Sequence, residues 1–170
     1  MWRRGALVLV TALAPAAARA TIIVNLDLDG VVAHADSVVI GTVVGERSLQ
    51  ADGHVVTETD IAVAETLVGV SVTSLVVTQP GGRDGSRTVT VQGTVALQRG
   101  QRVLLMTETT RLGRHVIVGL CQGAFVIDGE RVVQRVPVAV IDADGRVSAP
   151  PGERVFTLER VRAAIARRGR

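Results

Sequence analysis

Short apolar runs, most of them rich in valine, set the strongest limit on what this chain can fold into. Valine is branched at Cβ, which restricts its first side-chain torsion and favours strands over helices. Gly, Asp, Ser and Pro interrupt the runs, and this alternation is typical of strands joined by tight turns. The pattern predicts strands over residues 37–47, 55–66, 72–78, 88–91, 102–107, 115–120, 125–127, 131–133 and 138–141.

Two helices are expected, one near each end of this strand-rich region. Residues 26–35 carry apolar side chains at helical spacing, and residues 157–168 form an amphipathic stretch that Thr157 can cap. No helical segment separates successive strands, which argues against a parallel α/β sheet. We therefore expect an all-β domain over residues 21–148, folded as a small barrel or sandwich. A Pro-rich linker and the C-terminal helix then occupy residues 149–170.

The first twenty residues have the features of a secretory leader. A basic start precedes an apolar run over residues 6–13, and Ala18-Arg19-Ala20 matches the A-x-A pattern that signal peptidase reads. We expect cleavage between Ala20 and Thr21, and a periplasmic or secreted protein. A retained anchor is the alternative, but the apolar run is shorter than the roughly 20 residues of a membrane span. No later apolar stretch approaches that length.

The charge of the chain argues against a nucleic-acid partner. There are 19 basic and 16 acidic side chains, and three of the arginines lie in the leader, so the remainder has 19 − 3 = 16 basic and 16 acidic groups. Such a neutral, aromatic-poor chain lacks the basic patch and stacking platforms of a nucleic-acid binder. The arginine-rich residues 154–170 are interpreted as a solvated helix face with cations near the helix C-terminus. A tail that binds anionic surfaces is the alternative.

The single cysteine and the three histidines are the candidates for chemistry. Cys121 follows an apolar segment and is interpreted as a small buried hydrophobe, with a nucleophile beside a histidine as the alternative. One cysteine allows no disulfide within the chain. His34, His54 and His115 lack the spacings that place two metal ligands on one face. We expect no catalytic residue, metal or cofactor, although a metal site assembled from distant segments stays open.

Two loops contain residues found in ligand sites but have the spacing of turns. Pro80-Gly81-Gly82 precedes an arginine, yet phosphate loops need a longer glycine spacing and a following helix. Residues 142–145, with the sequence D-A-D-G, lack the twelve-residue calcium pattern. We interpret the first as a bend between strands and the second as a turn, and we expect Asp36 to cap or anchor the first strand.

Four segments between Ala35 and Ile127 suggest a family. They are residues 35–43 (ADSVVIGTV), 79–82 (QPGG), 100–105 (GQRVLL) and 118–125 (VGLCQGAF). In this order they resemble a family of uncharacterised bacterial exported proteins with the pattern A-D-x-V-V-x-G, P-G-G, G-x-x-V-L-L and Q-G-x-F. We interpret the matching positions as structural: Asp36, Gly41, Pro80, Gly81, Gly82, Gly100, Gln122, Gly123 and Phe125.

More distantly, the same arrangement is similar to netrin-like domains, which include the tissue inhibitors of metalloproteinases. The resemblance implies a five-stranded OB-like barrel. It does not carry the inhibitory chemistry, because those inhibitors use a disulfide-bonded N-terminal cysteine, whereas Thr21 is the expected first residue here.

Three functions follow as hypotheses. The first is an exported, non-enzymatic binding module for a protein or peptide, in one version associated with a protease. The second is an extracytoplasmic hydrolase built on His34, His54 or His115, which requires at least two of them in one cleft. The third is a structural component of the cell envelope held by the arginine-rich helix.

Overall fold

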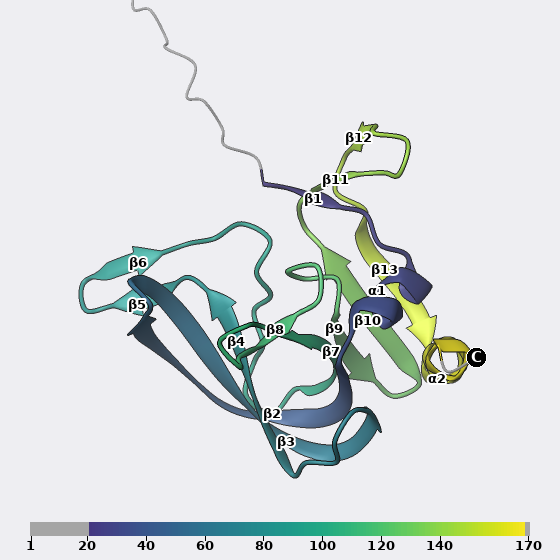
Figure 1. Ribbon diagram of the computed structural model, residues 1–170, viewed down its shortest axis with the longest axis horizontal. Coiled ribbons are helices and arrows are strands. Elements are labelled where there is room, and N and C mark those ends of the chain that lie inside the picture. The colour runs from purple at the N-terminus through teal and green to yellow at the C-terminus, as the bar shows by residue number, and fades with distance from the viewer. Residues whose placement is uncertain (1–20, 169–170) are drawn as a thin grey trace, which may run out of the picture.

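The computed structural model describes residues 21–168, and with 53% of residues in strands and 12% in helices it is mostly β, as expected. Helix α1 spans Leu28–His34 and α2 spans Leu158–Arg168 (Figure 1). The strands are β1 (Ile22–Val24), β2 (Ser37–Ala51), β3 (His54–Val68), β4 (Ser74–Pro80), β5 (Gly82–Asp84), β6 (Arg87–Val89), β7 (Arg102–Thr109), β8 (His115–Ile117), β9 (Ala124–Asp128), β10 (Arg131–Val136), β11 (Ala139–Ile141), β12 (Val147–Ser148) and β13 (Gly152–Thr157).

The main sheet contains eight strands in the order β13-β10-β9-β7-β2-β3-β4-β8. An additional pairing joins β8 to β7, so that β2, β3, β4, β8 and β7 form a ring of hydrogen-bonded neighbours. The parallel pair β4–β8 rests on one residue pair, Val77 and His115. The sheet therefore closes partly on itself, while β9, β10 and β13 extend it to one side. Two smaller sheets are β5–β6 and β1–β11–β12.

Strand β2 is long and bends, which allows it to pair with β3 along its length and with β7 in its first half. The register against β3 shifts at three places, one of them between Ile40 and Gly41. Such irregularities bend a strand and increase its twist. A Cβ atom on Gly41 would lie 2.5 Å from the carbonyl oxygen of Ala62, so the close approach of β2 to β3 requires glycine at this position.

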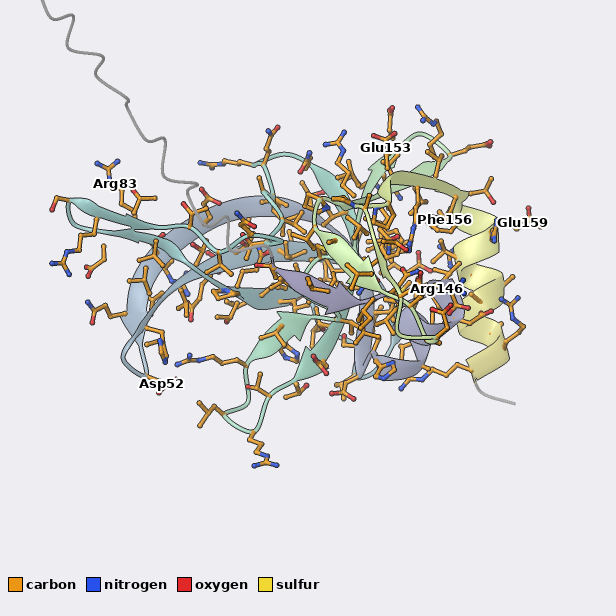
Figure 2. All side chains as sticks on the ribbon, turned by 90° about the horizontal axis from the view of Figure 1, so that it is seen from above. Asp52, Arg83, Arg146, Glu153, Phe156 and Glu159 are labelled. Carbon is orange, nitrogen blue, oxygen red and sulfur yellow. The ribbon has the colours of Figure 1, made fainter. Side chains whose placement is uncertain are left out.

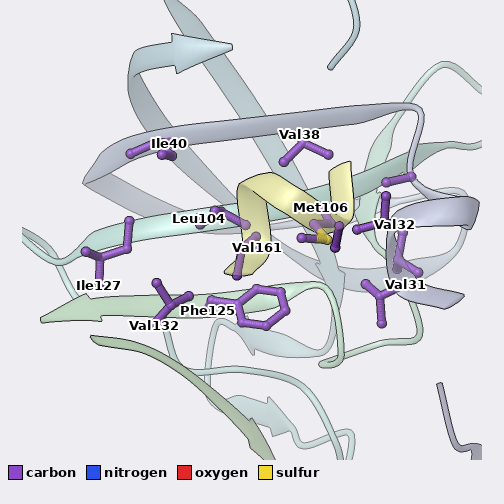
Figure 3. Close-up of a cluster of buried hydrophobic side chains, with 13 residues drawn as sticks. Val31, Val32, Val38, Ile40, Leu104, Met106, Phe125, Ile127, Val132 and Val161 are labelled. Carbon is purple, nitrogen blue, oxygen red and sulfur yellow. The ribbon is translucent and has the colours of Figure 1, made fainter. Parts of the chain in front are cut away.

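The main sheet separates two hydrophobic cores. One core collects side chains from all five ring strands, including Ile61, Leu105 and Ile117. The other lies between the sheet and the two helices, and Figure 3 shows Val161 of α2 packed near Leu104 and Phe125. Successive residues of β7 point to opposite faces of a strand, so β7 is buried on both sides, and Val103, Leu104, Leu105 and Met106 are each 0% exposed.

Each helix begins at a capping side chain, as was predicted for Thr157. Asp27 Oδ1 accepts a hydrogen bond from Gly30 N at 2.7 Å, and Thr157 Oγ1 accepts one from Arg160 N at 3.2 Å. A side-chain oxygen that accepts from the first turn satisfies an N–H group that the helix itself leaves unpaired. The caps therefore determine where α1 and α2 begin.

Several segments differ from the sequence expectation. Strands β1, β5 and β12 were not predicted, and α1 begins at Leu28 instead of Leu26. Strand β13 was not predicted, because Pro150 and Pro151 indicated a linker; the structure pairs all six of its residues with β10. Strand β8 ends at Ile117, three residues earlier than expected, because Gly119 and Leu120 take positive φ values of 59° and 66° and turn the chain. Proline lacks an N–H but does not prevent a strand from starting just after it, so residues 152–157 can join the sheet.

The leader and its cleavage position at Ala20 lie outside the described residues. Across residues 21–168, none of the helices has the length and apolar character needed to cross a membrane.

Candidate binding groove

Residues 94–98 cross the end of the ring without regular secondary structure, and we call them the strap. The buried amide of Gln79 holds the strap at its start: Val95 N donates to Gln79 Oε1 at 2.9 Å, and Gln79 Nε2 donates to Val95 O at 3.1 Å. Leu97 is 4% exposed and enters the ring core. Near the strap's end, Gln98 N donates to Gln101 Oε1 at 3.0 Å. The strap is therefore fixed at several points.

Three cavities surround the strap, and we call them together the strap groove. The first, of about 230 Å³, is walled by Val126 of β9 and Val133 of β10. The second, of about 280 Å³, lies against Glu46 and the bend at residues 80–82. The third, of about 510 Å³, opens between β2 and the end of the strap. Ala96 is exposed and lines all three cavities, so it marks their junction.

The backbone of Ala96 is open to a ligand. Within residues 21–168, neither its N–H nor its C=O takes part in a protein hydrogen bond, whereas the neighbouring Val95 is paired through Gln79. Backbone N–H and C=O groups form hydrogen bonds almost without exception when they are covered. A ligand that covers Ala96 must therefore supply a donor and an acceptor, as an extended peptide does.

Charged side chains of both signs line the strap groove. Glu46 lines the second and third cavities, and in the described part of the chain it has no ion-pair partner. Arg135 lines the first cavity, with its Nε 3.5 Å from Glu153 Oε2. Arg99 lies with Glu46 in the lining of the third cavity. The groove thus combines apolar walls with a basic edge at the first cavity and both signs of charge at the third.

The structure brings only some of the motif positions to this groove. Pro80, Gly81 and Gly82 line the second cavity, and both glycines have positive φ, which confirms the predicted bend. Gly100 follows the strap, and its N–H donates to Val43 O at 2.8 Å. Phe125 borders the first cavity, but its ring is buried in the helix-side core, 6.0 Å from the ring of Phe156.

The remaining motif positions have structural roles away from the groove. Asp36 Oδ2 accepts from Thr109 N at 2.8 Å and anchors the start of β2, as expected. Gly123 lies where a Cβ atom would overlap the carbonyl oxygen of Met106. Gly41 permits the close approach of β2 and β3 described above.

Gln122 is the centre of a polar clasp that fixes the N-terminal segment. It is 0% exposed; its Oε1 accepts from Leu26 N and its Nε2 donates to Val24 O, both at 2.8 Å. Arg154 completes the clasp, since Nη2 donates to Asn25 Oδ1 at 2.7 Å. Gln122 is one of the motif positions, but the sequence does not predict this role because its partners lie almost one hundred residues away in the chain.

The histidines are distributed over different elements. His34 lies on α1 with Nδ1 2.8 Å from Gly30 O, His54 begins β3, and His115 begins β8. An ion pair of 2.9 Å between Asp52 and Arg114 joins the turn before His54 to the loop before His115. Among residues 21–168, His, Cys, Asp and Glu side chains form no group of three that could hold a metal ion.

Cys121 is buried, as the sequence predicted. It is 0% exposed and packs with Val136, Val138 and Val140 in a third, small core. Burial raises the pKa of its thiol to about 11, and neither its own backbone hydrogen bond nor the positive charge of Arg154 offsets this effect. A thiol in such surroundings is a poor nucleophile.

We expect Cys121 to resist an aromatic disulfide reagent in the native protein. A pKa of about 11 in place of 9.0 leaves roughly 100-fold less thiolate near pH 8, and the side chain has no exposed surface. The measurement is the release of the coloured thiolate, with the same protein unfolded in urea as the control that should react fully. Rapid reaction of the folded protein would show that the thiol is accessible.

The arginines of α2 bind other parts of the protein while remaining partly exposed. Arg162 pairs with Glu65 of β3 at 2.6 Å, and this hydrogen-bonded pair lowers the pKa of the Glu65 carboxyl. Arg167 pairs with Asp29 of α1 at 2.6 Å, and Arg160 lies over the ring of Phe156. Figure 2 shows α2 at the opposite end of the molecule from Asp52 and Arg83. These contacts orient the helix, although exposed ion pairs add little stability.

Comparison of the chain with protein-family models, with curated proteins and with solved structures gave no match.

Proposed function

We propose that this protein is an exported, non-enzymatic binding module that holds an extended protein or peptide segment in the strap groove. The observation that carries the proposal is the position of Ala96, which is exposed, unpaired along its backbone and shared by three cavities. Extended peptides commonly bind through main-chain hydrogen bonds, with pockets that accept alternate side chains. The groove provides both kinds of contact.

The proposal includes an OB-like barrel as the scaffold. OB folds are five-stranded, partly open barrels that bind their ligands on one face and its loops. The ring of β2, β3, β4, β8 and β7 supports this interpretation, as does the core to which all five strands contribute. In this view the strap forms one wall of the ligand site.

The experiment is a selection of random peptides displayed on phage against the immobilised protein, followed by titration of the selected peptides. Ala96→Arg places a long side chain at the junction of the cavities without changing a buried residue, and it should weaken binding by about tenfold or more. Ala64→Arg is the matched control, because Ala64 is an exposed alanine on β3 outside the groove. Circular dichroism checks that both variants fold.

Two results would remove the proposal. One is a selection that enriches no peptide. The other is a set of peptides that bind wild-type protein and Ala96→Arg equally well, which would place the binding site elsewhere.

The protease-associated version of this function requires its own test. If the partner is a secreted metalloprotease, the protein should inhibit or form a complex with at least one member of a panel of such enzymes. If neither inhibition nor a complex is observed, the protease-associated version is wrong, while the proposal of peptide binding is not affected.

The other two hypotheses gain less support from the geometry. The three cavities of the strap groove are lined by no histidine or cysteine, whereas the hydrolase hypothesis needs two histidines in one cleft. The envelope hypothesis relies on cations of the C-terminal helix, and Arg162 and Arg167 are already paired with carboxylates of the same chain.

A further inference from the structure

The second cavity of the strap groove combines one negative charge with otherwise uncharged walls. Among the described residues that line it, Glu46 is the only one with an ionisable side chain. This side chain is exposed, and in the part of the chain that the structure describes it forms no ion pair. Apolar residues line the same cavity, among them Pro80, Val89 and Val91. A ligand in this cavity therefore meets a free carboxylate next to apolar surface.

Two of the three threonine hydroxyls in this cavity can only accept hydrogen bonds from a ligand. Thr57 Oγ1 donates to Gly81 O, and Thr94 Oγ1 donates to Val91 O, both at 2.9 Å. A hydroxyl has one proton and two lone pairs, so both oxygens have already given their protons to the protein. Ser48 Oγ, 3.3 Å from Thr57 Oγ1, uses at most one of the lone pairs on that oxygen. These walls therefore favour a ligand group that donates.

A basic side chain matches this cavity better than a neutral or an acidic one. The ammonium group of lysine and the guanidinium group of arginine have hydrogen-bond donors and no acceptor, which complements the Glu46 carboxylate and the two threonine oxygens. Their methylene stems pack along apolar surface while the charged ends reach polar groups. A neutral group would cover the carboxylate without a countercharge, at a cost in desolvation, and an acidic group would meet a like charge.

We propose, building on the peptide-binding function above, that the strap groove selects segments with an arginine or lysine side chain, which enters the second cavity and pairs with Glu46. Main-chain hydrogen bonds to Ala96 hold the segment, and the cavity supplies the choice of side chain. Arg99 lies with Glu46 in the lining of the third cavity but does not line the second. The basic side chain is therefore expected on the side of Glu46 that faces the second cavity.

Titration calorimetry with matched synthetic peptides tests this selection, using the full chain as its expression host processes it. The peptides are those enriched on the wild-type protein whose binding Ala96→Arg weakens. Each is also made with its basic residue exchanged for an uncharged counterpart, citrulline for arginine or acetyl-lysine for lysine. We expect this exchange to weaken binding by about fivefold or more, because fivefold corresponds to the strongest exposed ion pairs and the bound peptide partly covers this one.

Glu46→Gln keeps the length of the side chain and removes its charge, so the preference for the basic peptide should fall towards one. Glu108→Gln is the matched control. Glu108 is exposed on β7, lines none of the three cavities and has no ion pair within residues 21–168. Its replacement should leave the preference unchanged. Circular dichroism checks that both variants fold.

Three results would overturn the inference: enriched peptides without a basic residue, equal binding of the charged and uncharged peptides, or a preference that survives Glu46→Gln. In each of these cases, weaker binding to Ala96→Arg would still support the proposed function, so the two can fail separately. Peptides that bind wild-type protein and Ala96→Arg equally well would remove both.

Discussion

Replacing Phe125 by alanine is expected to lower the free energy of unfolding by about 3–5 kcal/mol, the usual cost of removing a buried aromatic ring. The side chain is 1% exposed and is the largest of the fully buried ones among residues 21–168. It lies between the main sheet and α2, with its ring edge-on to that of Phe156 at an interplanar angle of 73°. Because the surrounding strands cannot collapse into the space, the loss combines the transfer of apolar surface with a cavity.

Urea denaturation followed by circular dichroism measures this loss. A domain of this size is usually stable by about 5–15 kcal/mol, so Phe125→Ala should shift the midpoint strongly and bring the protein close to unfolding. Leu112→Ala serves as the control, because Leu112 is 70% exposed and surface changes usually stay within about 0.5 kcal/mol. A cost below about 1 kcal/mol for Phe125→Ala would contradict the packing of the helix-side core.

Gln122→Met is expected to destabilise the protein by about 2–4 kcal/mol, because it leaves two backbone groups without partners at a cost of about 1–3 kcal/mol each. Methionine has nearly the same length and shape, so packing is largely preserved. The groups that lose their partners are Leu26 N and Val24 O. The N-terminal segment should therefore loosen while the ring stays intact.

Hydrogen–deuterium exchange separates this local effect from general destabilisation. Amides of residues 22–26 should exchange faster in Gln122→Met, whereas those of β7 should change only in proportion to global stability. Gln98→Met is the control, since Gln98 is exposed on the strap and its side chain contributes no hydrogen bond in the described structure. Unchanged protection at residues 22–26 would contradict the clasp.

Local sequence patterns predicted most of the elements because each depends on residues close together in the chain. The cap of Thr157, the bend at Gly81 and the burial of Cys121 are of this kind. Strand β13 was not predicted because the neighbouring prolines indicated a linker. In the structure, residues 152–157 pair with strand β10. Isolated propensity is a weak guide where pairing decides the conformation.

The candidate binding groove could not be predicted from the sequence to the same extent. Ala96 belongs to no motif, and its importance comes from the cavities that meet around it. The strap that contains Ala96 is held through Val95 by Gln79, which lies sixteen residues before Val95 in the chain. Of the motif positions, only the bend at residues 80–82, Gly100 and the edge of Phe125 lie near the groove.

By itself, then, the sequence determined a mostly β chain with one helix near each end, since valine-rich alternation and capping residues act within a few residues of one another. Only the tertiary structure decided which strands meet, how Gln122 reaches Leu26 across 96 positions, and where the strap leaves a groove. Strands pair through backbone groups that every residue has. Which distant strand a given strand pairs with therefore depends on the packing of the whole fold and not on the residues of one segment.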